Sequence, residues 1–427
     1  MGNSNIGFQF FADAGTLVNT TGNYVNAYTG TPTAFDTNNK LTPTMKTFYD
    51  TQLLENARPE LIFAQLAKKQ ALPRNHGKSV EWRKWNTLPE AETLTEGVIP
   101  TGQKLGMSSM TQDLVQKGLY VTISDLLELH AIDNAILGAT EELGASGGMS
   151  IDKMVRNEVV GGTVKQLCDK VNATTGEHTE VTERSGMDTT CVLTPTEVNK
   201  AVTTLKKAHA PTINGKYVGI IHPSVAFDLR QSKEWVEAHK YAAVTELFNG
   251  EIGELHGVRF VETTEAKIFR GDDLAKNSRT LSVNGKVENA AAVGFDGGTV
   301  AANALKGRYV LVGGKRCKVV GNTASQLTLD TAVTAADNDV IYPGEGGSQG
   351  CAVYGCLFLG KGAYGVVDLS EGTEVIVKPR GSSGTADPLD QRSSVGWKGI
   401  HAAAILYDEY IVRVECGSSY SGEDKAN

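Results

Sequence analysis

The pattern of hydrophobic and polar side chains first becomes regular between residues 78 and 123. Apolar and polar positions alternate over 78–88, and strand-forming residues are dense again over 107–123. Alternation with a period of two is typical of a strand with one buried face, so the two runs predict a long β-hairpin. Their connection, 89–106, is too long for a tight turn and carries few apolar residues. We expect it to project and to need a partner that covers it.

A helical spacing of three and four residues follows this hairpin. Ser124 is suited to cap a helix whose apolar stripe runs to the glycine-rich stretch 144–148. A second helix is predicted to restart at Ser150 and to continue to Val171, although Gly161-Gly162 weakens it by about 1 kcal/mol per residue relative to Ala. We interpret the two helices as one long, interrupted element.

The strongest local signal is the run Thr194-Pro195-Thr196-Glu197. Thr at the cap, Pro at the first helical position and Glu three residues after the cap satisfy the unpaired amides at a helix start. The pattern predicts a helix over 198–205, a strand over 217–221, a helix over 224–239 and a strand over 258–262. Together these elements predict a compact α+β unit.

The first forty residues and the stretch 271–350 have a different character. Residues 1–40 are rich in Asn, Thr and Gly and predict an extended arm, and a short helix is predicted over 59–67. Over 271–350, Gly, Asn, Thr and Val dominate, which indicates an inserted all-β module. Its predicted strands are 308–312, 315–320 and 326–329, and core-like strands resume at 357–359, 364–367, 395–406 and 410–414.

Composition restricts the function more than it restricts the fold. The chain has 427 residues, 40% of them hydrophobic, which is enough for two or three domains. Charged residues make up 21%, the formal net charge is −8, and no basic run is dense enough for duplex binding, so sequence-specific DNA recognition is not expected. Neither a signal peptide nor an apolar stretch of membrane-spanning length is visible, so we expect folding in a bacterial cytoplasm and no membrane partner.

Motifs for catalysis, cofactors and metals are weak. The six cysteines form no C-x-x-C pair, so reduced, mostly buried thiols are expected. The run 355–361 nearly matches a phosphate-binding loop, but Gly362 replaces the Ser or Thr that holds magnesium, and the apolar run favours a strand. Glu92 and Glu96, or His222, leave a hydrolase as an alternative, although neither set has the surroundings that such chemistry needs. We predict no catalytic residue, no cofactor and no metal ligand.

Six longer motifs are spread over the chain. They are Arg58-Pro59-Glu60-Leu61-Ile62-Phe63, Leu94-Thr95-Glu96-Gly97, the stretches 222–230, 249–253 and 257–263, and Asp387–Lys398. These motifs resemble the coliphage N-four branch of the major capsid proteins of tailed bacteriophages. The similarity covers roughly residues 41–270 and 351–416, so the arm and the β-rich module fall outside it.

The resemblance implies an α+β fold of the Hong Kong ninety-seven capsid type. Its expected parts are an extended N-terminal arm at 1–40, an arm and helix leading to the shell domain at 41–76, an extended loop at 77–120, a peripheral domain with a long helix at 121–184, an axial domain at 185–270 and 351–372, an inserted β-rich domain at 271–350, and peripheral strands with the C-terminus at 373–427. The implied role is structural and non-catalytic. Copies of the chain would form the hexamers and pentamers of an icosahedral head around genomic DNA.

The resemblance also implies partners and a location. The partners are other copies of the chain, a portal protein, scaffold or decoration proteins, and packaged double-stranded DNA without sequence specificity. The chain is then a virion protein that assembles in the host cytoplasm. One relative of this fold forms a Lys–Asn cross-link, which no motif here transfers to this chain.

The candidate contacts between subunits lie in or beside the projecting connection. They are Trp82, Trp85, Glu92, Glu96 and Lys104. A bacterial protein nanocompartment of the same fold is an alternative function, and a surface-binding role for the inserted module also stays open.

Overall fold

The computed structural model describes residues 18–21, 40–41, 62–72, 78–86, 88–91, 93, 96, 99, 102–130, 135–172, 175–232, 235–236, 253–369, 373–382 and 387–427. The chain divides into two compact units, which we describe separately. The first comprises 1–61, 69–152 and 366–402, and the second comprises 62–68, 153–365 and 403–427. Most of the arm predicted at 1–40 lies outside the described residues.

A seven-stranded sheet forms most of the first unit. Its strand order is β2-β1-β6-β23-β21-β3, and β22 pairs with β23 beside this path. The strands are β1 Val18–Thr21, β2 Lys40–Leu41, β3 Lys68–Leu72, β6 Val115–Ser124, β21 Tyr364–Leu369, β22 Thr373–Lys378 and β23 Arg392–Ile405. The longest ladder is antiparallel and joins β6 to β23, from Arg392↔Ser124 to His401↔Val115.

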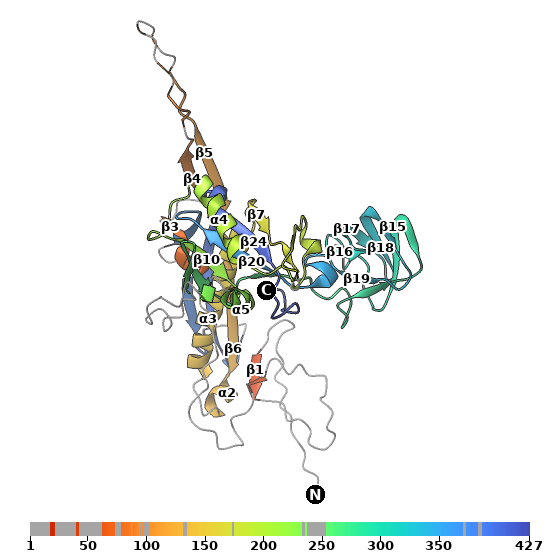
Figure 1. Cartoon of the computed structure of the whole chain (residues 1–427). Helices are drawn as coiled ribbons and strands as arrows, with labels where there is room; N and C mark the ends of the chain where they lie inside the picture. The colour runs from red at the N-terminus through yellow and green to blue at the C-terminus, as the bar shows by residue number, and fades with distance from the viewer. Residues whose placement is uncertain are drawn as a thin grey trace. The chain divides into compact units, whose positions relative to one another are not determined.

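The predicted hairpin is confirmed, but its second strand is shorter than expected. β4, Ser79–Trp85, pairs antiparallel with β5, Met107–Asp113 (Figure 1). The run 107–123 is not one strand, because it divides at Leu114, after which β6 leaves the hairpin and pairs with β23. Leu114 packs against Val80 and Val367, and this apolar contact marks where the chain changes its pairing partner.

Helix α3, Ala135–Val160, corrects the predicted interruption at 144–148. It follows the short helix α2, Asp125–His130, whose predicted cap is confirmed because Ser124 Oγ accepts a hydrogen bond from the Leu127 N–H at 3.3 Å. The glycines allow close packing: a β-carbon at Gly147 would lie 3.3 Å from the Trp397 ring. Leu143 packs on the same tryptophan. Tertiary packing therefore outweighs the low helix propensity of this stretch.

The predicted continuation of this helix to Val171 is also wrong. The N–H groups of Gly161 and Gly162 bond back to the carbonyls of Glu158 and Val159, and the helix ends there. The apolar residues beyond are strands: β7 Lys165–Leu167, β8 Lys170–Val171 and β9 His178–Thr179. Two adjacent glycines stop a helix when strand pairing competes with it.

The second unit contains another seven-stranded sheet. Its order is β11-β12-β10-β20-β24-β7, with β13 paired to β20. The strands not yet given are β10 Tyr217–Ile221, β11 Gly253–Leu255, β12 Val258–Glu262, β13 Lys267–Phe269, β20 Val353–Leu359 and β24 Ile411–Cys416. Every residue of β10 and β20 is buried. The strand reading of the run that resembles a phosphate-binding loop is thus confirmed.

Helices α4, Pro195–Lys207, and α5, Pro223–Gln231, pack on this sheet, and α1 is a single turn, Phe63–Leu66. The predicted cap of α4 is confirmed, because the Thr194 side chain accepts a hydrogen bond from the Glu197 N–H at 3.4 Å. Helix α5 ends earlier than predicted. The three-residue 3-10 helices are Arg184–Gly186, Ser348–Gly350 and Asp408–Tyr410.

A buried ion cluster is built on strand β24 of this sheet. The carboxylate of Glu415, which is 1% exposed, accepts hydrogen bonds from Arg184 at 2.5 and 2.6 Å and from Arg413 at 2.9 Å. The Arg184 guanidinium also lies over the Phe269 ring at 3.6 Å. Two cations around one carboxylate satisfy most of its acceptor capacity inside the core.

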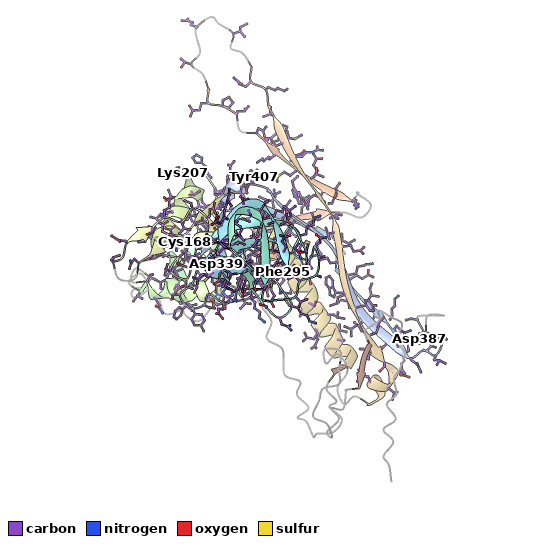
Figure 2. All side chains as sticks on the ribbon, turned by 90° about the vertical axis from the view of Figure 1, so that its right-hand side faces the viewer. Cys168, Lys207, Phe295, Asp339, Asp387 and Tyr407 are labelled. Atoms are coloured by element: carbon purple, nitrogen blue, oxygen red, sulfur yellow. The ribbon has the colours of Figure 1, made fainter. Side chains whose placement is uncertain are left out.

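The stretch predicted as an inserted all-β module forms a closed barrel (Figure 1). Its strand order is β14-β15-β18-β17-β16-β19. The bounds are β14 Leu281–Val283, β15 Val287–Asp296, β16 Tyr309–Val312, β17 Lys315–Asn322, β18 Gln326–Ala335 and β19 Val340–Pro343. Inward-facing Val, Leu and Phe side chains, including the Phe295 labelled in Figure 2, fill a core of its own. Gly313, with φ of 55°, leaves no room for a side chain beside the Thr334 carbonyl.

Candidate subunit interface

The β4–β5 hairpin stands apart from the two large sheets as a two-stranded sheet. Seven register pairs run from Ser79↔Asp113 to Trp85↔Met107, and the Asn86 N–H continues the ladder to the Gly106 carbonyl at 2.9 Å. An isolated two-stranded hairpin is marginally stable in water. Its length therefore indicates that another surface supports it.

The base of the hairpin is anchored in the first unit. Val80 is buried against Val367 and Ala402, and Trp82 packs partly buried on the same cluster. The Trp82 indole Nε1 is buried, with no hydrogen-bond partner in the part of the chain that the structure describes. Trp82 therefore helps to anchor the hairpin on its own chain, and its predicted role in contacts between subunits stays a prediction.

The far end of the hairpin exposes large apolar side chains. Trp85 is 66% exposed and Ile99 is 92% exposed. Leu88, Leu105 and Met107 are each at least half exposed nearby in the sequence. Exposed apolar side chains grouped on one projecting element are typical of a protein–protein contact.

The other predicted contact residues lie in the connection between the two strands. Glu96 and Lys104 are exposed in the connection, whereas Glu92 lies outside the described residues. Their roles in contacts between subunits stay predictions. The exposed apolar residues beyond Trp85 were not singled out from the sequence, although their position in a connection with little to pack was a usable signal.

The hydrolase alternative uses Glu92, which lies outside the described residues, or His222, whose side chain caps a helix. His222 Nδ1 accepts a hydrogen bond from the Ser224 N–H at 3.2 Å and so caps α5. The Ser224 hydroxyl donates to Asp424 Oδ2 at 2.8 Å, so its single proton is directed away from the imidazole. Burial lowers the pKa of His222, which keeps the ring neutral and able to accept at pH 7. His222 and Ser224 therefore start helix α5 and connect it to Asp424, and they are not arranged as a nucleophile and its base.

Asp424 is the centre of these contacts. Besides Ser224, its carboxylate accepts hydrogen bonds from Tyr354 Oη at 2.6 Å and Ser421 Oγ at 2.7 Å. Burial raises the pKa of Asp424, but the three hydroxyl donors outweigh burial and leave the pKa below its ordinary value of 3.8. These bonds fix the segment 417–427 to α5 and β20. No local sequence pattern predicts this contact.

We expect Asp424→Asn to lower the free energy of unfolding at pH 7 by about 1–2 kcal/mol, because three donors lose a charged acceptor that is itself partly exposed. A lowered pKa in the folded state stabilises above pH 3.8 and loses this effect as the pH falls through the folded value. The difference between variant and parent should therefore shrink below pH 4. Urea denaturation at pH 7 and pH 3.5 measures both effects. Glu423→Gln, a change at the exposed neighbouring carboxylate, is the control and should show neither.

The described residues contain no cluster of His, Cys, Asp or Glu able to hold a metal ion. No helix in the described part of the chain is long and apolar enough to cross a membrane. All six cysteines are free thiols, and five of them are buried. Burial raises the pKa of Cys191 to about 11, so this thiol is protonated at neutral pH.

Comparison with known proteins agrees with this architecture. A family model described as "Phage capsid protein" matches residues 132–337, slightly less than half of the chain. No curated protein matches. The matched range begins just before α3 and ends in the turn between β18 and β19, so it includes most of the barrel.

Three solved capsid structures share the fold over nearly their full length. The chain is similar to the capsid of cyanophage P-SCSP1u, with 13% identity and a TM-score of 0.53 over 90% of this chain and 97% of that chain. The capsid of Ralstonia phage GP4 is 13% identical with a TM-score of 0.53, over 90% of this chain and 98% of that chain. The capsid of cyanophage Pam1 is 12% identical with a TM-score of 0.56, over 88% of this chain and 96% of that chain. These matches confirm the predicted α+β capsid fold of the Hong Kong ninety-seven type, and the family model that matches residues 132–337 is that of a phage capsid protein.

Proposed function

We propose that this chain is the major capsid protein of a tailed bacteriophage related to coliphage N-four. Copies of it form the hexamers and pentamers of an icosahedral head that encloses double-stranded DNA without reading its sequence. Its role is structural and non-catalytic, and its partners include a portal and a scaffold or decoration protein. The net charge of −8 suits a container wall that does not hold its DNA through phosphate contacts.

The observation that carries this proposal is the β4–β5 hairpin. It is anchored at its base by Val80 and Trp82, while Trp85 and Ile99 remain exposed beyond that base. A monomer would leave these side chains in water. A neighbouring copy that covers them gives each subunit the same contact, which a closed symmetric assembly repeats.

Electron microscopy of the purified, overexpressed chain tests the proposal. We expect closed shells, capsomers or tubes, with and without a scaffold protein from the same phage. A chain that stays monomeric at high concentration under both conditions would refute a capsid role. Cargo enclosed in shells that lack a portal vertex would instead favour a protein nanocompartment.

We propose further that the barrel faces the outside of the shell and adds contacts there. Its two ends meet at the sheet, since Phe269 of β13 pairs with Val353 of β20. A segment whose ends are neighbours is readily added to an exposed loop. Residues 345–350 are more than a connection, because the Ser348 N–H bonds to the Met187 carbonyl at 2.7 Å.

We expect a short Gly-Ser linker in place of residues 272–344 to leave the rest of the second unit folded. The barrel has its own core, so its removal exposes little of the sheet core. Circular dichroism and thermal unfolding of the shortened chain check this. Removal of 271–350 is the informative comparison, because it also deletes the Ser348 contact and should be less stable. Global unfolding of the 272–344 variant, or a density map with the barrel on the DNA side, would contradict the placement.

A further inference from the structure

The large sheet of the first unit has one strand edge that no other described strand covers. Strand β22 pairs with β23 on one side, in register from Thr373↔Gly399 to Lys378↔Ser394. The preceding strand, β21, is flanked by β3, but β22 has no neighbour on its other side among the described strands. Unpaired N–H and C=O groups along such an edge are a template for another strand.

The side chains of β22 suit an intermolecular contact. Val375 and Val377 are 51% and 53% exposed, although they lie opposite the buried residues Trp397 and Val395 of β23. They extend an apolar face, covered by α3 at its centre, to the rim of the sheet. β-branched side chains that remain half exposed on a regular strand favour pairing with a further strand.

The sequence of this edge is complementary to itself. We propose that β22 of one subunit pairs antiparallel with β22 of a second copy around a two-fold axis through Ile376, and this proposal rests on the assembly role given above. The axis places Glu374 opposite the partner's Lys378, and Val375 opposite the partner's Val377. Both charge pairs are formed at once, because a two-fold contact repeats each pair.

Backbone geometry allows this register, and the charge pairs select it among those allowed. Alternate residues of β22 bond to β23, so every second residue offers its N–H and C=O outward. Two identical edges can bond only if outward residues face outward residues, which requires the paired residue numbers to differ by an even number. The axis at Ile376 fulfils this and pairs the whole run 374–378. A shift by one residue pairs outward with inward groups and also separates the charges.

Existing contacts are compatible with this arrangement. Glu374 lies 3.6 Å from Lys398 of its own subunit, with both side chains largely exposed, so its carboxylate can accept a second cation. The connection between β22 and β23, which contains the Asp387 labelled in Figure 2, is closed by a hydrogen bond from the Arg392 N–H to Asp387 Oδ2 at 2.8 Å.

Charge reversal in the full chain tests the pairing. Glu374→Lys alone, or Lys378→Glu alone, turns both intermolecular pairs into like-charge contacts, and we expect the protein concentration needed for assembly to rise about tenfold. The double variant restores the pairs with reversed signs and should assemble like the parent. A mixture of the two single variants should also recover, because each offers the charge that the other lacks. Lys398→Glu, which changes only the contact within the subunit, is the control.

A cysteine on the proposed axis gives an independent readout. In Ile376→Cys, two copies bring their new thiols together, and oxidised glutathione should convert them to one disulfide with release of two reduced glutathione molecules. The expected product is a dimer on a non-reducing gel. Val377→Cys, which faces Val375 of the second copy, should give at least about tenfold less disulfide-linked dimer. Shells that form normally from both single charge variants, without cross-linked dimer, would refute the pairing and leave the capsid role intact. Absence of shells from the parent chain would refute the capsid role itself.

Discussion

A chain in which residues 90–104 are replaced by a short Gly-Ser turn is expected to fold normally but to form no stable shells. The replaced residues contribute little to either core, because the described side chains among them are exposed. In the proposed assembly they are instead one repeated contact of every subunit. Since a shell multiplies weak contacts, loss of one at each subunit should reduce assembly by about 100-fold or more. Sedimentation and electron microscopy measure assembly, and thermal unfolding measures the fold.

A variant that keeps the length of the loop tests whether its apolar side chains, and not its length alone, are needed for assembly. Trp85→Ser together with Met107→Ser removes two exposed apolar side chains and retains every backbone bond of the hairpin. We expect weaker assembly and an unchanged melting temperature. Normal shells from the shortened chain would show that the hairpin is not a subunit contact.

Glu415→Gln should cause the largest loss of stability of any single substitution considered. The neutral amide leaves Arg184 and Arg413 without their shared carboxylate inside the sheet core, and breaking a buried ion pair in this way costs about 3 kcal/mol. Denaturant unfolding at pH 7 gives the value. The partly exposed pair of Lys216 and Glu254 offers a control, and Glu254→Gln should cost less than about 1 kcal/mol.

The same carboxylate predicts a dependence on pH. Burial raises the pKa of Glu415, but Arg184 and Arg413 outweigh burial and hold the pKa below its ordinary value of 4.5. The stabilisation is therefore present above pH 4.5 and is lost as the pH falls through the folded value. Between pH 7 and pH 3.5 the free energy of unfolding should fall more for the parent than for the Gln variant, because the variant has no carboxylate at this position to protonate. A parallel decline of parent and variant would show that the ion cluster does not control acid stability.

Local signals predicted much of the fold. The capped start at Thr194 and the strand at 355–361 depend on neighbouring residues only, and both are confirmed. The hairpin depends on alternation with a period of two, which is equally local. In each case the chemistry that decides the conformation lies within a few residues of the position concerned.

Long-range packing decided what the sequence could not predict. The stretch 144–148 stays helical because Gly147 fits against Trp397, a residue 250 positions later in the chain. The break at Leu114 depends on Val367 in the same way. A glycine that permits close approach and a glycine that breaks a helix look alike until the partner is known.

The hairpin that carries the candidate interface was predicted from the sequence, and its contacts with another subunit stay predictions. Trp85 and the connection at 89–106 follow from an alternating run that ends in a stretch with nothing to pack, whereas Trp82 is an anchor that the pattern did not distinguish from Trp85. The edge at 374–378 gave no signal by itself. Whether this strand forms an edge of the sheet depends on its pairing with β23, and the sequence alone does not show that pairing.

The closed barrel has a consequence for errors in assembly. A growing shell brings many identical chains to a very high local concentration, and any free strand edge then invites indiscriminate polymerisation. Every barrel strand has a neighbour on both sides, so this part of the chain adds surface without adding such an edge. Its turns, such as the one at Asn338, can accept new residues without creating a template for fibres. The barrel is therefore the region where this chain can diverge, or be engineered to carry foreign peptides, at the lowest risk to the shell.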